Sequence, residues 1–128
     1  MGYLLDTHVL LWVASDSPRL SLQVRTLIES AGDDVYYSVA SLWEVVVKHS
    51  LGRADFRVDA RRLRSEALLQ GYRELPIRAN HVLATAELPS IHSDPFDRLL
   101  LAQARYEQLS FLTANRKVLQ YGEGTVEV

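Results

Sequence analysis

Short runs of apolar, aromatic and β-branched residues alternate with helical patterns from one end of the chain to the other. Strands that are regularly followed by helices predict an α/β protein with a mostly parallel sheet, because parallel neighbours need a crossover connection. We therefore expect a three-layer α/β/α sandwich with a five-stranded sheet. The predicted strands are residues 3–5, 35–37, 72–77, 110–113 and 125–128.

The predicted helices begin and end at recognisable capping residues. Ser21 precedes one helix and Gly32 closes it, whereas the helix that stops at Gly52 begins after either Ser38 or Ser41. The chain has 128 residues with no repeat, linker or low-complexity segment, which predicts a single domain over residues 1–128. Helices are expected over residues 7–14, 21–30, 38 or 41 to 51, 60–70 and 80–88, from Asp97 onward, and over 115–121.

Polar side chains stand where predicted strands give way to helices. Asp6 directly follows the first strand, Glu44 lies in the helix after the second, and Thr113 and Asn115 follow the fourth. Ligands of parallel sheets bind outside the carboxyl ends of the strands. We therefore expect these residues to gather at one edge, together with Asp94 and Asp97 of the His92–Arg98 segment, and to form an acidic pocket.

Each acid also has a purely structural interpretation. Asp6 and Asp97 are able to cap the helices that follow them, and Asp94 before Pro95 is typical of a turn. Glu44 fits a capping box with Ser41, unless Ser38 is the cap, in which case Glu44 lies deeper in the helix and is free to face a pocket.

Convergence of the acids would require a cation. Two carboxylates about 4 Å apart repel by roughly 4 kcal/mol at an effective dielectric constant near 20, which is large beside the stability of a small domain. His8, His49, His81 and His92 lack the spacing of zinc ligands, so an oxygen site for Mg²⁺ or Mn²⁺ fits best. Such sites in nucleases bind the scissile phosphate and activate a water for hydrolysis.

Charge is unevenly distributed although the formal net charge is only −2. All but two of the 14 basic residues are arginines, the side chain suited to bidentate phosphate or carboxylate contacts. The cluster is either a basic strip for nucleic acid or a solvated helix face with internal ion pairs. Its members are Arg53, Arg57, Arg61, Arg62, Arg64 and Arg73.

The chain contains no cysteine, which excludes disulfides and thiolate metal sites and indicates a reducing, cytoplasmic setting. No apolar stretch approaches the roughly 20 residues of a membrane span, so we expect no membrane partner.

Four motifs in order resemble PIN-domain ribonucleases, in particular the VapC-like toxins of bacterial toxin–antitoxin pairs, and the resemblance covers nearly the whole chain. The motifs are Leu4-Leu5-Asp6-Thr7-His8; Ser41-x-Trp43-Glu44-Val45-x-x-Lys48 with Leu51-Gly52-Arg53; His92-x-Asp94-Pro95-Phe96-Asp97-Arg98-Leu99-Leu100-x-Ala102-Gln103-Ala104; and Leu112-Thr113-Ala114-Asn115 with Tyr121-Gly122.

The resemblance implies a Mg²⁺-dependent endoribonuclease, usually homodimeric, that is silenced by an antitoxin whose tail enters the active-site groove. By position, Asp6, Glu44 and Asp97 would bind the metal and Thr113 would complete the catalytic set. In supporting roles, Thr7 would line the pocket, Asp94 would be a nearby acid, and Arg98 would orient the carboxylates or meet substrate phosphate. RNA or antitoxin contacts are expected at Arg53, Arg61 and Arg62.

One departure and two rival functions remain open. Asn115 stands where the family usually has a fourth aspartate, so the pocket loses one charge and a second metal site is in doubt. A receiver-like Mg²⁺-binding signalling domain is the first alternative, although Leu75-Pro76-Ile77 offers no phosphoacceptor aspartate after the third strand. The second is a catalytically inactive PIN domain that serves as a binding module.

Overall fold

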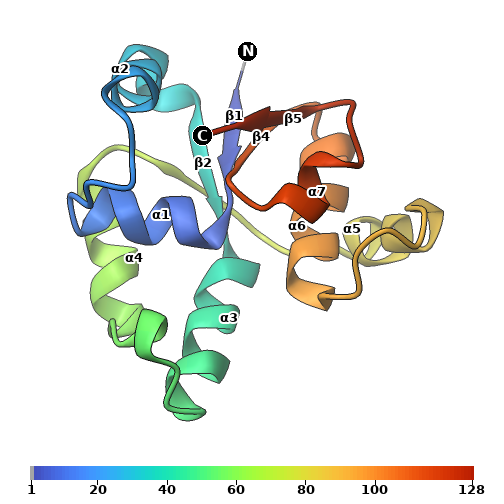
Figure 1. Ribbon diagram of the computed structural model, residues 1–128, viewed down its shortest axis with the longest axis horizontal. Coiled ribbons are helices and arrows are strands. Elements are labelled where there is room, and N and C mark those ends of the chain that lie inside the picture. The colour runs from blue at the N-terminus through green and yellow to red at the C-terminus, as the bar shows by residue number, and fades with distance from the viewer. Residues whose placement is uncertain (1) are drawn as a thin grey trace.

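Five short strands form the central sheet of the computed structural model, which describes residues 2–128 (Figure 1). All neighbouring strands pair in parallel, and their order across the sheet is β3-β2-β1-β4-β5. The predicted sheet is confirmed, and it is parallel throughout. The strands are β1 (Tyr3–Leu5), β2 (Val35–Ser38), β3 (Arg73–Leu75), β4 (Ser110–Thr113) and β5 (Thr125–Glu127).

Helices cover both faces of this sheet, which confirms the three-layer α/β/α sandwich. In Figure 1, α1, α2 and α4 lie on one side of the strands and α5, α6 and α7 on the other, while α3 extends below the sheet. The helices are α1 (Thr7–Ala14), α2 (Leu22–Ala31), α3 (Val39–Ser50), α4 (Ala60–Leu69), α5 (Ala79–Ala84), α6 (Pro95–Tyr106) and α7 (Arg116–Leu119).

The two faces of the sheet bury two separate apolar clusters. Side chains alternate along a strand, so Leu5 packs with one cluster beneath α1, α2 and α4, and Leu4 packs with the other beneath α6 and α7. Leu112 and Phe111 of β4 divide in the same way. This double burial explains why the strands read as continuous apolar runs in the sequence.

Local capping moves several element boundaries from their predicted places. The Ser38 hydroxyl accepts a hydrogen bond from the Ala40 amide at 2.9 Å, so α3 begins at Val39. Helix α6 begins at Pro95 and not at Asp97, because the Asp94 carboxylate accepts from the backbone amides of Phe96 and Asp97. Strand β3 is shorter than predicted, and α5 ends at Ala84 before a 3₁₀ turn over Thr85–Glu87.

The strand order places a topological switch point in the middle of the sheet, and we call the space outside the carboxyl ends of β1 and β4 the crevice. From β1 the chain builds outward to β2 and β3, and later returns to the other side of β1 to add β4 and β5. The carboxyl ends of β1 and β4 therefore flank the topological switch point, where open parallel sheets bind ligands.

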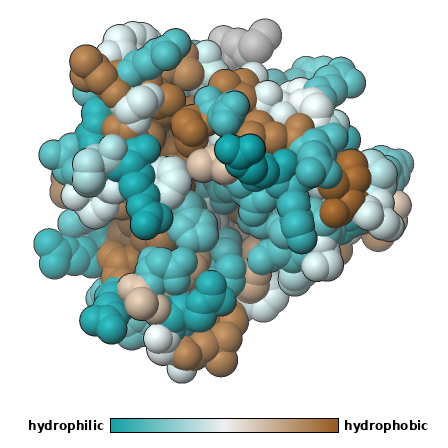
Figure 2. Space-filling view, in the orientation of Figure 1, coloured by the Kyte–Doolittle hydropathy of each residue, from teal (hydrophilic) through white to brown (hydrophobic). Residues whose placement is uncertain are grey.

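Hydrophilic side chains surround smaller apolar groups on the face of the molecule shown in Figure 2. Within residues 2–128, no helix combines the length and the apolar composition needed to cross a membrane.

Candidate active site

Asp6 and Thr113 meet at the switch point of the sheet. Asp6 continues the pairing of β1 with β4, since its amide donates to the Leu112 carbonyl at 2.9 Å. The Thr113 hydroxyl donates to Asp6 Oδ2 at 2.5 Å, and both residues are buried. The orientation of the Asp6 carboxylate is thereby fixed at the carboxyl end of β1.

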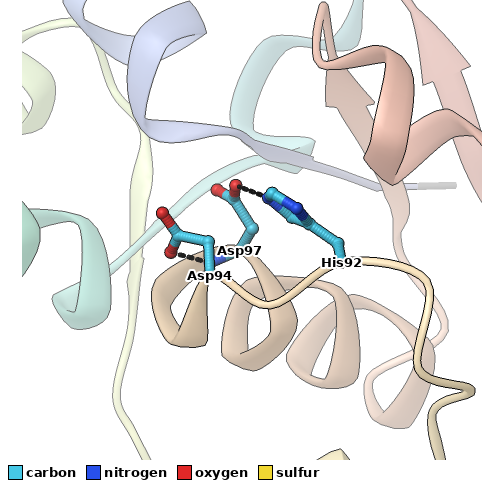
Figure 3. Close-up of side chains that lie close together, drawn as sticks. All are labelled: His92, Asp94 and Asp97. Carbon is cyan, nitrogen blue, oxygen red and sulfur yellow. Dashed lines mark hydrogen bonds and ion pairs between the residues drawn. The ribbon is translucent and has the colours of Figure 1, made fainter.

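Asp97 approaches the same crevice from the first turn of α6. His92 Nε2 lies 2.7 Å from Asp97 Oδ2, and Figure 3 shows these two side chains pointing toward each other. One ligand atom each from His92, Asp94 and Asp97 lies within 4.8 Å of the others, which makes them a candidate metal-binding group. His92 Nδ1 is buried and has no hydrogen-bond partner among residues 2–128.

Asn115 serves two neighbours at once. Its Oδ1 accepts from the Lys117 and Val118 amides at 2.9 and 3.3 Å and so caps α7. Its Nδ2 donates to Asp97 Oδ2 at 3.4 Å. The Asn115 side-chain amide therefore both caps the N-terminus of α7 and contacts the acidic site.

Glu44 lies on the α3 side of the site with both carboxylate oxygens engaged. The Thr7 hydroxyl donates to Oε1 at 2.6 Å and Lys48 Nζ donates to Oε2 at 2.5 Å. The Ser41 hydroxyl lies 2.9 Å from that of Thr7. Because Ser38 caps α3, the interpretation of Ser41 and Glu44 as a capping box is wrong, and Glu44 sits in the second turn facing inward.

Burial makes Asp6 and Asp97 hard to ionise. Loss of solvent raises the pKa of Asp97 to about 8, and the charges of Asp6, Asp94 and Glu44 add to the rise. Burial likewise raises the pKa of Asp6, against the hydrogen bond from Thr113 that lowers it. Buried carboxylate oxygens that repel one another suit a hard divalent cation such as Mg²⁺ or Mn²⁺, so the donor set fits such an ion.

The expected role of Arg98 in orienting the carboxylates is not supported. Its guanidinium donates to the carbonyls of Pro89 (3.0 Å), Thr85 (2.9 Å) and Leu88 (3.3 Å) and to the Tyr121 hydroxyl (3.0 Å). The side chain turns away from the acids because it satisfies the loop that precedes α6. Arg98 therefore acts on that loop.

The arginine cluster is partly neutralised by neighbouring acids. Arg62 pairs with Glu66 at 3.1 Å and Arg64 with Glu74 at 2.6 Å. Arg53 lies 3.8 Å from Asp55, whereas Arg61 is exposed with no ion pair among residues 2–128. The continuous basic strip that the sequence suggested is thus broken into single cations, and among residues 2–128 only Arg57 and Arg61 of the cluster have no ion pair.

Lys48 and His92 are the site residues whose roles sequence reasoning missed. Both residues belong to motifs that the sequence displays. A lysine one helical turn after Glu44 is, however, also the pattern of an ordinary ion pair on a helix surface, so its role in the site was not apparent. The available signal for Lys48 was its position four residues after Glu44, which places both side chains on the same side of the helix.

The fold and the acidic crevice define an α/β protein with a candidate divalent-cation site at the switch point of a parallel sheet. A family model described as the PIN domain matches residues 3–124. The chain therefore belongs to the PIN domain family. PIN domains are typically nucleases that use a divalent metal, so a nuclease activity is the class that family membership supports.

Solved structures with the same fold include toxin–antitoxin complexes. A toxin–antitoxin complex from Klebsiella pneumoniae is 19% identical with a TM-score of 0.69, over 98% of this chain and 96% of that chain. DNA-bound VapBC from Salmonella typhimurium is 15% identical with a TM-score of 0.71, over 100% and 97%. FitAcB from Neisseria gonorrhoeae is 18% identical with a TM-score of 0.66, over 98% and 95%. A search of curated protein sequences gives no match.

Proposed function

We propose that this protein is a Mg²⁺-dependent endoribonuclease and the toxin of a cytoplasmic toxin–antitoxin pair. The observation that carries the proposal is the convergence of two buried carboxylates, Asp6 from the end of β1 and Asp97 from the start of α6, at the switch point of the sheet. Membership of the PIN domain family and the likeness to toxin–antitoxin complexes support it.

Asp6, Glu44 and Asp97 would hold the cation, with Mn²⁺ able to replace Mg²⁺. Bound there, the cation would supply activation of a water and neutralise charge on the RNA phosphate. Thr113 fixes the Asp6 carboxylate and Thr7 fixes that of Glu44, so both hydroxyls reduce the freedom of groups that must meet one ion. Asp94 caps α6 and thereby orients the turn that carries Asp97.

RNA phosphates would meet the exposed arginines beside the α3–α4 connection. Arg61 has no competing ion pair among residues 2–128, so it is the best candidate, while Arg53 and Arg62 would first have to leave Asp55 and Glu66. Exposed ion pairs of this kind are worth at most about 1 kcal/mol, which an RNA phosphate contact can replace.

The antitoxin would occupy a groove between α1 and the segment that leads into α4. The groove has a volume of about 700 Å³, and its lining combines apolar side chains with three arginines and with Asp55, Asp59 and Glu66. Such a lining suits a peptide that carries apolar residues and charges of both signs. Its lining includes His8, Leu11, Trp12, Arg19, Arg57 and Arg62. Protection of these residues from hydrogen exchange only in the presence of a co-purified antitoxin would check this assignment.

A second copy of the chain would cover α5, where Val82 and Leu83 are 51% and 70% exposed. Apolar side chains side by side on one helix are unfavourable in water and commonly mark an interface. Analytical ultracentrifugation should show a dimer that Leu83→Asp converts to a monomer; a monomeric native protein would exclude this arrangement.

The receiver-like alternative is contradicted by the strand order. Receivers have the flavodoxin-like order 2-1-3-4-5, whereas this sheet has the order 3-2-1-4-5. A catalytically inactive PIN domain that serves as a binding module is the remaining alternative, and an activity assay separates it from the enzyme.

Cleavage of RNA by the purified protein tests the proposal. Mg²⁺ or Mn²⁺ should support cutting and excess chelator should stop it. Asp6→Asn and Asp97→Asn should each lower the rate by at least about a hundredfold, because each removes a charge that the cation needs. Asp34→Asn is the matched control, since Asp34 is exposed at the opposite edge of the sheet. Undiminished cutting in chelator, or by both site variants, would refute the proposal.

A further inference from the structure

Lys48 lies between two of the acids of the site and contacts both. Its Nζ donates to Glu44 Oε2 at 2.5 Å and lies 3.7 Å from Asp94 Oδ2. Glu44 belongs to α3 and Asp94 caps α6, so this ammonium group links the two helices that bring acids to the crevice.

Aromatic rings restrict where this ammonium can go. Nζ lies 5.0 Å from the centre of the Phe56 ring and 5.7 Å from that of Phe96, both within the range of cation–π attraction. Only 15% of the Lys48 side chain is exposed. The cation therefore has a defined position, unlike the freely moving ammonium of an exposed lysine.

Because Lys48 has this fixed position, its positive charge offsets some acids of the site more than others. Glu44 and Asp94 face a permanent cation. Asp6 and Asp97 face the Thr113 hydroxyl, the Asn115 amide and the His92 imidazole. A divalent ion held by the acids would therefore be attracted most by Asp6 and Asp97, whose charge no cation offsets directly, and Lys48 would repel it.

We propose that Lys48 is a positioning residue that acts as a built-in cation: it fixes the Glu44 and Asp94 carboxylates for catalysis and lowers the affinity of the site for its divalent ion. The inference rests on the proposed metal-dependent function. It assigns to one side chain two effects of opposite sign on metal binding and on turnover, which loss of structure alone would not produce.

Isothermal titration of Mn²⁺ without RNA tests the effect on metal binding. Lys48→Met should bind Mn²⁺ about tenfold more tightly than the native protein, because it removes a positive charge near the ion. Lys48→Arg keeps the charge and should bind as the native protein does. Lys117→Met is the matched control, since it removes the only other lysine, from an exposed position on α7.

Turnover supplies the second half of the test. Lys48→Met should cut RNA at least about tenfold more slowly at saturating metal despite its tighter binding, and Lys48→Arg should recover part of the rate. Unchanged or weaker Mn²⁺ binding by Lys48→Met would overturn the proposal. Absence of Mn²⁺ binding by the native protein would instead refute the proposed function itself, so the two failures are distinguishable.

A measurement on the native protein covers the case in which Lys48→Met does not fold. With only two lysines, the ¹⁵N spectrum of the side-chain ammonium groups has two signals to assign. Addition of Mg²⁺ should shift the Lys48 signal and leave that of Lys117 in place. A Lys48 chemical shift that does not change at saturating Mg²⁺ would overturn the proposal without any variant.

Discussion

Asp97 lies in surroundings that strongly oppose its ionisation. Its side chain is mostly removed from water, and the carboxylates of Asp6, Asp94 and Glu44 face it, while Lys48 offsets only part of that charge. The folded protein therefore retains a proton on Asp97 to about pH 8, whereas the unfolded chain releases it near pH 4.

This difference predicts how stability depends on pH when chelator is present. Between about pH 4 and 8 the folded state binds the proton and the unfolded state does not, so the free energy of unfolding falls as pH rises. The melting temperature should drop by about 5 °C or more across this interval. Asp97→Asn should flatten the slope, and Mg²⁺ should restore stability at pH 8 because it binds only the folded state.

Asp34→Asn provides the control for the pH experiment, since it removes an exposed aspartate and should leave the slope unchanged. A melting temperature in chelator that does not vary between pH 4 and 8 would mean that Asp97 ionises freely, and would contradict the strong mutual influence of the acids.

Residues of the site differ in how far the sequence could reveal them. Asp6 and Thr113 were predictable because they directly follow strands of one parallel sheet, whose carboxyl ends share an edge. Asn115 was expected at the pocket and contacts Asp97 there, and its side chain also caps α7. The direction of a long side chain depends on tertiary neighbours, which is why no role for Lys48 was apparent from the sequence and why the Arg98 guanidinium contacts the loop before α6 and not the carboxylates.

At the scale of elements, the loop between α5 and α6 depends on Arg98. The two terminal nitrogens of the guanidinium divide between acceptors: Nη1 reaches Pro89, His92 and Tyr121, and Nη2 reaches Thr85 and Leu88. The same loop delivers His92 to Asp97, and the Tyr121 hydroxyl also accepts from the His92 amide.

Replacing Arg98 should therefore remove the hydrogen bonds that hold this loop and destabilise the protein. Arg98→Met should lower the free energy of unfolding by about 2–4 kcal/mol, because several carbonyls lose a charged donor together. Arg98→Lys should recover little, since one ammonium cannot reproduce the planar fork. Denaturant unfolding measures both, with Arg116→Met of exposed Arg116 as the control. Equal stability of the native protein and all three variants would contradict the role of Arg98 in holding this loop.

The existence of most helices and strands could be predicted, but their ends could not always be. Helix α1 matches its prediction because a strand precedes it and Ser15 to Pro18 stop it. For α3 two serines were equally good caps by type, and only the contact between Ser38 and the Ala40 amide distinguishes them. Strand β3 is short because its length depends on pairing with β2, a non-local contact.

At the scale of the whole molecule, strand order is what turns scattered acids into one site. Asp6 and Thr113 are 107 residues apart in sequence but adjacent in space, because β1 pairs with β4. The alternation of strands and helices predicted the sandwich but left the order 3-2-1-4-5 undetermined. That order also separates this fold from the receiver-like alternative, so topology bears directly on the functional conclusion.

Anomalous diffraction from Mn²⁺-soaked crystals tests most directly whether the converging acids form a metal centre. We expect the strongest peak within the crevice, beside the Asp6 and Asp97 carboxylates, and its loss in crystals of Asp97→Asn. A map without density at these carboxylates, or with an unchanged peak in the variant, would contradict the central role assigned to the acidic crevice.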